Sequence, residues 1–106
     1  MADFMGMMGK VQELQGRMQK MQAELEATEV TGSAGGGLVS VILSAKGALK
    51  KISIDASLMK PTEKEIVEDL IAAAHADARA KAERAMEEKM RELTGGLPLP
   101  PGLKLF

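Results

Sequence analysis

The feature that most constrains this fold is one long amphipathic segment near the end of the chain. Residues 63–93 repeat apolar or small side chains three or four positions apart, which predicts one helix of about 45 Å at roughly 1.5 Å per residue. Pro61, Thr62 and Glu65 form a helix start with Thr62 as the capping residue, and Gly95–Gly96 ends the pattern. A helix of this length needs a long surface to pack on.

The strands predicted before this helix are too short to cover it. Residues 38–45 and 48–55 alternate apolar and polar side chains around Lys46–Gly47, which predicts a β-hairpin. Residues 29–31 add a short candidate strand, and the glycine-rich stretch 32–37 is interpreted as a flexible turn. Because strands of this length are shorter than the helix, part of the helix must project beyond the sheet or pack against another chain.

The opening of the chain predicts a second helix with one apolar edge. Within residues 4–28, apolar side chains alternate at spacings of three and four, the pattern of a coiled-coil seam, at Phe4, Met7, Val11, Leu14, Met18, Met21 and Leu25. Gly6, Gly9 and Gly16 weaken this helix, so residues 1–9 are expected to be flexible unless a partner holds them. The seam is interpreted as an internal or dimeric interface, with a methionine-rich peptide-binding groove as the alternative.

The core has to be built almost without aromatic side chains. The 106 residues include nine Met and two Phe but no Trp and no Tyr. A single domain of this size has a thin core, and helix faces made of Ala bury little area each. A second copy of the chain would complete such a core. Because the chain has no Cys, disulfides and thiolate zinc sites are excluded.

The charge balance argues against binding nucleic acid through overall charge, because the net charge is −1. Positive charge would have to be concentrated locally, and two scattered sets of cations would meet if the two helices ran antiparallel. The candidate phosphate-binding residues are Lys10, Arg17, Lys20, Arg84, Lys89 and Arg91. On the second helix, spacing alone slightly favours a solvated face whose cations pair with nearby Glu residues, and a phosphate-binding face is the alternative.

The sequence predicts no catalytic site, no metal site, no cofactor and no small-molecule substrate. The stretch 32–37 lacks the Lys-Ser/Thr of a P-loop and leads into a strand. His75 is the only histidine, and no nucleophile or rigid pocket is predicted around it. No segment has the length and apolar character of a secretory signal or a membrane span, so a soluble cytoplasmic protein is expected.

Several segments resemble one known family. The most specific are Val30-Thr31-Gly32 with Gly37-Leu38-Val39, Ile54-Asp55 with Ser57-Leu58, Glu68-Asp69-Leu70, and Leu99-Pro100-Pro101-Gly102. Together with the Met- and Gln-rich opening helix, they are similar to the YbaB/EbfC family of bacterial nucleoid-associated proteins over nearly the whole chain. None of these pieces is a catalytic motif, so the resemblance bears on fold and role.

The resemblance implies an α+β fold, a single domain over residues 1–106 with the order α-β-β-β-α and a small antiparallel sheet. It also implies a homodimer whose long helices project like the arms of tweezers. We expect the dimer interface to include Val39, Val41, Leu43, Ile52, Ile54, Leu70, Ala74 and Ala78. Residues 95–106 form a Pro-rich apolar tail, which is expected to dock on its own domain or on the partner chain.

The function implied by the resemblance is binding of double-stranded DNA at the bacterial nucleoid, with a role in organising the nucleoid or influencing gene expression. Single-strand recognition is not expected, because the chain lacks aromatic stacking platforms. Weak sequence preference is expected, because the chain lacks a recognition-helix motif. The alternative function is a protein–protein adaptor. In that role, the Met/Leu seam and the apolar tail would bind a DNA-repair or replication partner.

Overall fold

The computed structural model describes residues 2–94, and side chains within residues 4–93. The chain contains two long helices and a three-stranded sheet, in the order α1 (Ala2–Ala27), β1 (Glu29–Ala34), β2 (Val39–Ser44), β3 (Leu49–Ile54) and α2 (Lys64–Thr94). Two short 3-10 turns, Ala56–Leu58 and Pro61–Glu63, connect β3 to α2. The predicted α-β-β-β-α order and the α+β class are confirmed.

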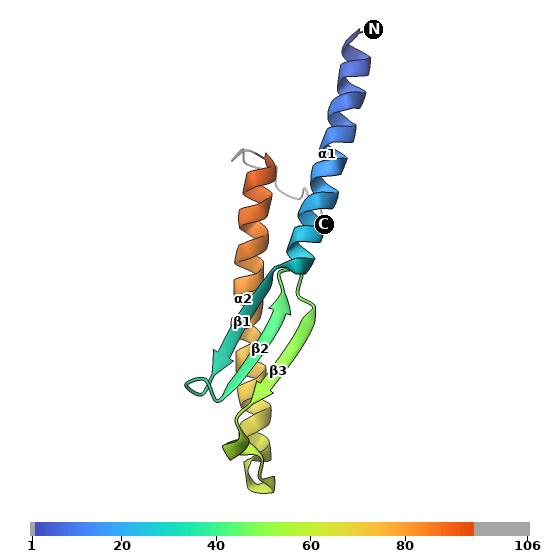
Figure 1. Cartoon of the computed structure of the whole chain (residues 1–106). Coiled ribbons are helices and arrows are strands. Elements are labelled where there is room, and N and C mark those ends of the chain that lie inside the picture. The colour runs from blue at the N-terminus through green and yellow to red at the C-terminus, as the bar shows by residue number, and fades with distance from the viewer. Residues whose placement is uncertain (1, 95–106) are drawn as a thin grey trace.

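The sheet is antiparallel with the strand order β1-β2-β3, and α2 packs across one of its faces along β1 and β2 (Figure 1). The first strand is longer than the predicted 29–31. It continues to Ala34, and the turn into β2 is made by Gly35–Gly37, all at positive φ. Glycine adopts this left-handed backbone without the steric cost that a Cβ would add, which explains why three of them stand together here.

The prediction that Gly32 belongs to a flexible turn is wrong. Gly32 lies inside β1 opposite Val41, and its backbone rests on α2. A Cβ built at this position would overlap the carbonyl oxygen of Ala74 and the backbone nitrogen of Ala78. Because Gly32, Ala74 and Ala78 are all small, β1 can lie directly on the helix backbone.

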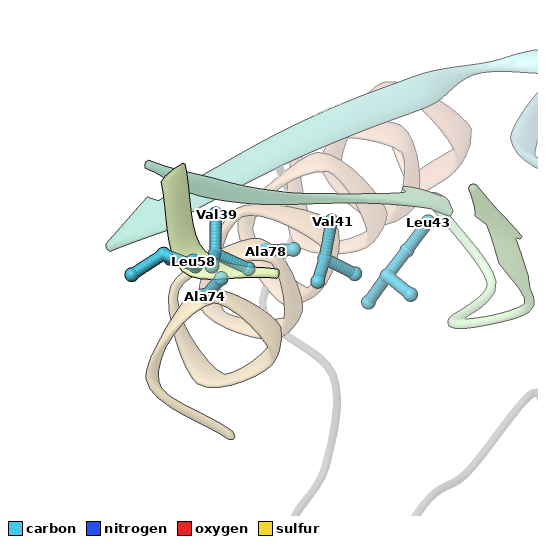
Figure 2. Packing of buried hydrophobic residues seen from close by; sticks show 6 residues of the cluster. All are labelled: Val39, Val41, Leu43, Leu58, Ala74 and Ala78. Carbon is cyan, nitrogen blue, oxygen red and sulfur yellow. The ribbon is translucent and has the colours of Figure 1, made fainter. Parts of the chain in front are cut away.

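The main core lies between β2 and α2. Val39, Val41 and Leu43 project from the sheet toward the helix side, where Ala74 and Ala78 lie (Figure 2). All five are at most 1% exposed, and Leu58 closes the cluster from the connection to α2. Burying a Val or Leu side chain contributes roughly 1.5–3 kcal/mol relative to the exposed state. The aliphatic and alanine-lined core therefore forms within one chain.

The entry into α2 differs from the predicted cap. Lys60 is the N-cap of the 3-10 turn and makes no side-chain capping hydrogen bond. Pro61 stands at the first position of that turn, so Thr62 lies inside it instead of at its boundary. Proline suits the first helical position because it has no N–H to satisfy and its φ is already fixed. The prediction of Thr62 as the cap is therefore wrong, although the helix begins within one residue of the predicted position.

The two helices run antiparallel and diverge away from the sheet, and α1 continues well past the end of α2 (Figure 1). The extents of the molecule are 72 × 24 × 17 Å. Only the last part of the predicted seam is covered, where Met21 and Leu25 pack against Ala45. The stretch from Phe4 to Arg17 is exposed. Helix α1 begins at Ala2, so the flexibility expected for residues 1–9 stays a prediction, and the tail 95–106 lies outside the described residues.

Candidate nucleic-acid interface

A groove opens where α1 and α2 begin to diverge. It is about 270 Å³ in volume and is lined from α1 by Arg17, Lys20, Met21 and Glu24, and from α2 by Lys89, Glu92 and Leu93. Met21 and Leu93 supply its apolar lining. The antiparallel course of the two helices brings three predicted phosphate-binding residues, Arg17, Lys20 and Lys89, into one groove. The sequence predicts that antiparallel helices would bring Lys10 and Arg17 near Arg84, Lys89 and Arg91, and this is confirmed for Arg17 with Lys89.

Ion pairs hold two of the cations of this groove, Lys89 and Arg17. Lys89 Nζ donates to Glu24 Oε2 at 3.2 Å and lies 3.5 Å from Glu92 Oε2. The hydrogen bond and charge of Glu24, followed by the charge of Glu92, raise the pKa of Lys89, so its amine stays protonated. Arg17 Nη2 donates to Glu13 Oε1 at 2.7 Å on the exposed side of α1. An incoming anion would therefore compete with carboxylates for these cations.

Lys10 extends this line of positive charge along α1. It stands seven residues before Arg17, and seven residues make almost two complete turns of an α-helix. The two side chains therefore leave the same side of α1, roughly 10 Å apart along its axis. Lys10 is exposed beyond the end of the groove.

Arg84 and Arg91 lie on a different side of α2 from the groove. They are seven residues apart and share one side of the helix, whereas two residues separate Lys89 from Arg91 and turn the helix by about 200°. Arg84 Nε donates to the carbonyl oxygen of Ala80 at 3.5 Å. The structure thus brings three of the six predicted cations together, with Lys10 continuing the line. Whether any of the six contacts DNA stays a prediction.

A second polar cluster, which the sequence did not reveal, joins α2 to β1. The backbone N–H of Ser33 donates to Asp77 Oδ2 at 3.1 Å, and Lys81 Nζ donates to the carbonyl oxygen of Thr31 at 2.8 Å. Asp77 and Lys81 also pair with each other at 3.3 Å. Their spacing of four residues predicts a helical ion pair, but nothing in the sequence indicated the contact with β1. Lys81 is thus engaged by the fold.

Removing the charge of Asp77 is expected to reduce the acid sensitivity of the fold. The N–H of Ser33, followed by Lys81, lowers the pKa of Asp77 from its ordinary 3.8. Its stabilising effect is therefore present above about pH 4 and is lost as the pH falls through the lowered pKa. Thermal unfolding at several pH values between about 7 and 2 should show a shallower decline of Tm in Asp77→Asn than in the unmodified protein. Asp69→Asn, at an exposed position of the same helix, is the control, and an unchanged decline in Asp77→Asn would refute this role.

The predicted interface residues fall into two groups. Val39, Val41, Leu43, Ala74 and Ala78 are buried within the chain itself and have almost no exposed surface to offer a second copy. Ile54 and Leu70 are half-buried, and Ile52 is 40% exposed. The exposed part of the predicted interface is therefore centred on Ile52, and the interface itself stays a prediction.

Within residues 2–94, no helix has both the length and the apolar character needed to cross a membrane. The same part of the chain contains no group of three or more His, Asp or Glu side chains placed to hold a metal ion. His75 lies half-buried on α2.

Comparison with known proteins agrees with this fold and with the earlier resemblance. The family model described as the YbaB/EbfC DNA-binding family matches residues 1–97. A nucleoid-associated protein of Rhizobium meliloti is 59% identical over 105 residues, which cover 99% of this chain and 98% of that protein. One from Nitrobacter hamburgensis is 62% identical and covers 99% of both chains. The chain therefore belongs to the YbaB/EbfC DNA-binding family.

A solved structure has the same fold. The crystal structure of an uncharacterised protein from Helicobacter pylori matches with a TM-score of 0.65 and 26% sequence identity. The match covers 84% of this chain and 89% of that one. The fold is thus retained between two chains that differ at most positions.

Proposed function

We propose that this protein acts as a homodimer at the bacterial nucleoid, in the cytoplasm, and binds double-stranded DNA with little sequence preference. The observation that carries the proposal is the convergence of Arg17, Lys20 and Lys89 in one groove between two antiparallel helices. The chain's membership of a DNA-binding family and the names of its nucleoid-associated relatives support the same function. Organisation of the nucleoid, or an influence on gene expression, would follow from such binding.

The proposed mechanism is neutralisation of backbone phosphates. A phosphate that reaches the groove exchanges its condensed counterions for Arg17, Lys20 and Lys89, and the release of those counterions favours binding. To reach Lys89 it must displace Glu24 and Glu92, which hold that ammonium in the free protein. The competition keeps affinity modest. Phosphates carry no sequence information directly, so a grip of this kind is insensitive to sequence.

The test is binding of the purified full chain to fluorescently labelled duplexes of unrelated sequence, followed by anisotropy over a range of salt concentrations. Three phosphate contacts predict that log affinity falls against log salt with a slope of about −3 per bound chain. Affinities for the different duplexes should agree within about tenfold, since specific sites differ from non-specific ones by about a thousandfold or more. Absence of binding at low salt by a folded dimer would overturn the proposal and leave the adaptor function.

The dimer is supported by an apolar side chain on the edge strand, Ile52, which the chain leaves partly exposed. Ile52 pairs with Val41 across the β2–β3 ladder, so both side chains lie on the α2 side of the sheet. Helix α2 covers β1 and β2, whereas Ile52, on the edge strand β3, remains 40% exposed. A second copy placed against β3 would extend the core over this side chain and remove an exposed sheet edge.

Replacing Ile52 with Glu is expected to weaken the dimer by at least about a hundredfold, because a carboxylate would be buried in an apolar contact. Sedimentation equilibrium of the unmodified protein should give twice the chain mass, and Ile52→Glu should shift it to the single-chain mass. Ser53→Glu is the matched control, since Ser53 is exposed on the opposite face of the same strand. Equal dimer stability in Ile52→Glu would place the interface elsewhere.

A further inference from the structure

The free half of α1 carries an apolar stripe that no described part of the chain covers. The stripe is defined as Phe4, Met7, Met8, Val11 and Leu14, whose exposed fractions lie between 44 and 65%. Four of these residues, together with Gln12, line a hollow of about 270 Å³. A contiguous apolar surface of this kind on a small protein marks a contact site. Gly6 and Gly9 weaken the same half of the helix, which adds to its need for support.

Helix α2 ends beside the base of this stripe. Leu93 lines the same groove as Arg17 and Met21, so the chain leaves α2 next to the middle of α1 (Figure 1). From Arg17 to Phe4 the helix axis rises about 20 Å. The residues that follow α2 thus begin at one end of the stripe.

The sequence of residues 95–106 has the length and chemistry to cover this stripe. Gly95 and Gly96 allow the chain to turn away from α2, and the remaining residues, LPLPPGLKLF, contain one charged side chain, Lys104. Pro-rich segments favour an extended conformation of about 3.1 Å per residue, so twelve residues reach about 37 Å. This reach exceeds the roughly 20 Å required. The leucines and Phe106 match the apolar stripe.

We propose that residues 95–106 dock on the α1 stripe of their own chain, as a strap along the free half of α1. The occupant is the chain's own tail because it starts beside the stripe, and a short tether gives it an effective concentration in the millimolar range. The strap shields Phe4, Met7 and Val11 from water. Lys10 and Arg17 leave α1 from another side of the helix, so the strap leaves the cations accessible.

A spin label tests this placement, because the chain has no Cys of its own. Lys104→Cys, carrying a nitroxide, keeps every apolar residue of the tail. In a sample with ¹³C-labelled methionine methyl groups, the label is expected to broaden the signals of Met7 and Met8 and to leave Met59 sharp. Met59 is exposed and belongs to the connection between β3 and α2, which lies at the opposite end of the molecule from the free half of α1 (Figure 1). A label at Lys60→Cys is the control and should broaden Met59 alone.

Two outcomes would overturn the proposal. Sharp Met7 and Met8 signals with the label at position 104 would mean that the tail lies elsewhere. The second outcome comes from a mixture in which some chains carry only the ¹³C label and the others carry only the nitroxide. If the Met7 and Met8 signals broadened as strongly in this mixture, the tail would cross to a second copy. DNA does not enter this experiment, so its result is independent of the proposed function.

Discussion

Replacing Gly32 with Ala is expected to destabilise the protein by about 3 kcal/mol or more, at the upper end of what added atoms cost in a packed core. The new methyl group would overlap the backbone of α2 at Ala74 and Ala78, and backbone cannot move aside as a flexible side chain can. Strand β1 would have to lift from the helix, which would stretch the hydrogen bond from Ser33 to Asp77. The free energy of unfolding of a small domain is about 5–15 kcal/mol, so this loss is a large fraction of the total stability. Urea unfolding at a fixed protein concentration measures it.

Gly16→Ala is the matched control, because it adds the same methyl group where nothing lies within 4 Å. Alanine favours a helix over glycine by about 1 kcal/mol, so this variant should be as stable as the unmodified protein or slightly more so. If the free energy of unfolding fell in Gly32→Ala but not in Gly16→Ala, the loss at position 32 would come from the contact with α2. A loss below about 1 kcal/mol in Gly32→Ala would show that β1 and α2 are less tightly packed than described.

Most of the secondary structure could be predicted because each element carries a local pattern. The β-branched alternation in β2 and β3, the turn at Lys46–Gly47 and the long periodic segment of α2 depend on neighbours in sequence, which a sequence displays directly. Gly32 is the exception, because its role depends on a contact with Ala74 and Ala78, more than forty positions away. The pair of alanines four positions apart on α2 was the available indication of a close backbone approach.

The covered length of the α1 seam could not be predicted. A heptad pattern identifies the face of a helix that is apolar. Which part of that face is covered depends on where the helix packed against it ends, and here that helix is α2. Because α2 ends beside Arg17 and Met21, the seam is buried at Met21 and Leu25 and exposed from Phe4 to Leu14. The course of the two helices also decides which of the predicted cations share the groove. Antiparallel helices join Lys89 to Arg17 and Lys20, whereas the turn of α2 directs Arg84 and Arg91 elsewhere.

Reversing two groove charges together, Arg17→Glu with Lys20→Glu, is expected to weaken DNA binding by about 100-fold near 0.1 M salt, because two phosphate contacts are lost. Each lost phosphate contact makes the negative slope of log affinity against log salt shallower by about 0.9, so the slope should become shallower by about 2 per bound chain. The fold should persist, because both side chains are exposed and the lost pair between Arg17 and Glu13 is a surface pair of small energy. Anisotropy of a labelled duplex over several salt concentrations measures both quantities, and an unchanged Tm confirms the fold.

Lys60→Glu with Lys64→Glu is the control for that experiment, because it changes the net charge equally and also removes one exposed ion pair, between Lys64 and Glu68. These lysines lie at the opposite end of the molecule from the groove, several Debye lengths away at physiological salt (Figure 1). Their reversal should therefore change the affinity by less than about threefold. If both double variants weakened binding equally, the effect would come from overall charge and the groove would not be the contact site. If only the groove variant bound DNA more weakly and with a shallower dependence on salt, phosphates would be bound where α1 and α2 diverge.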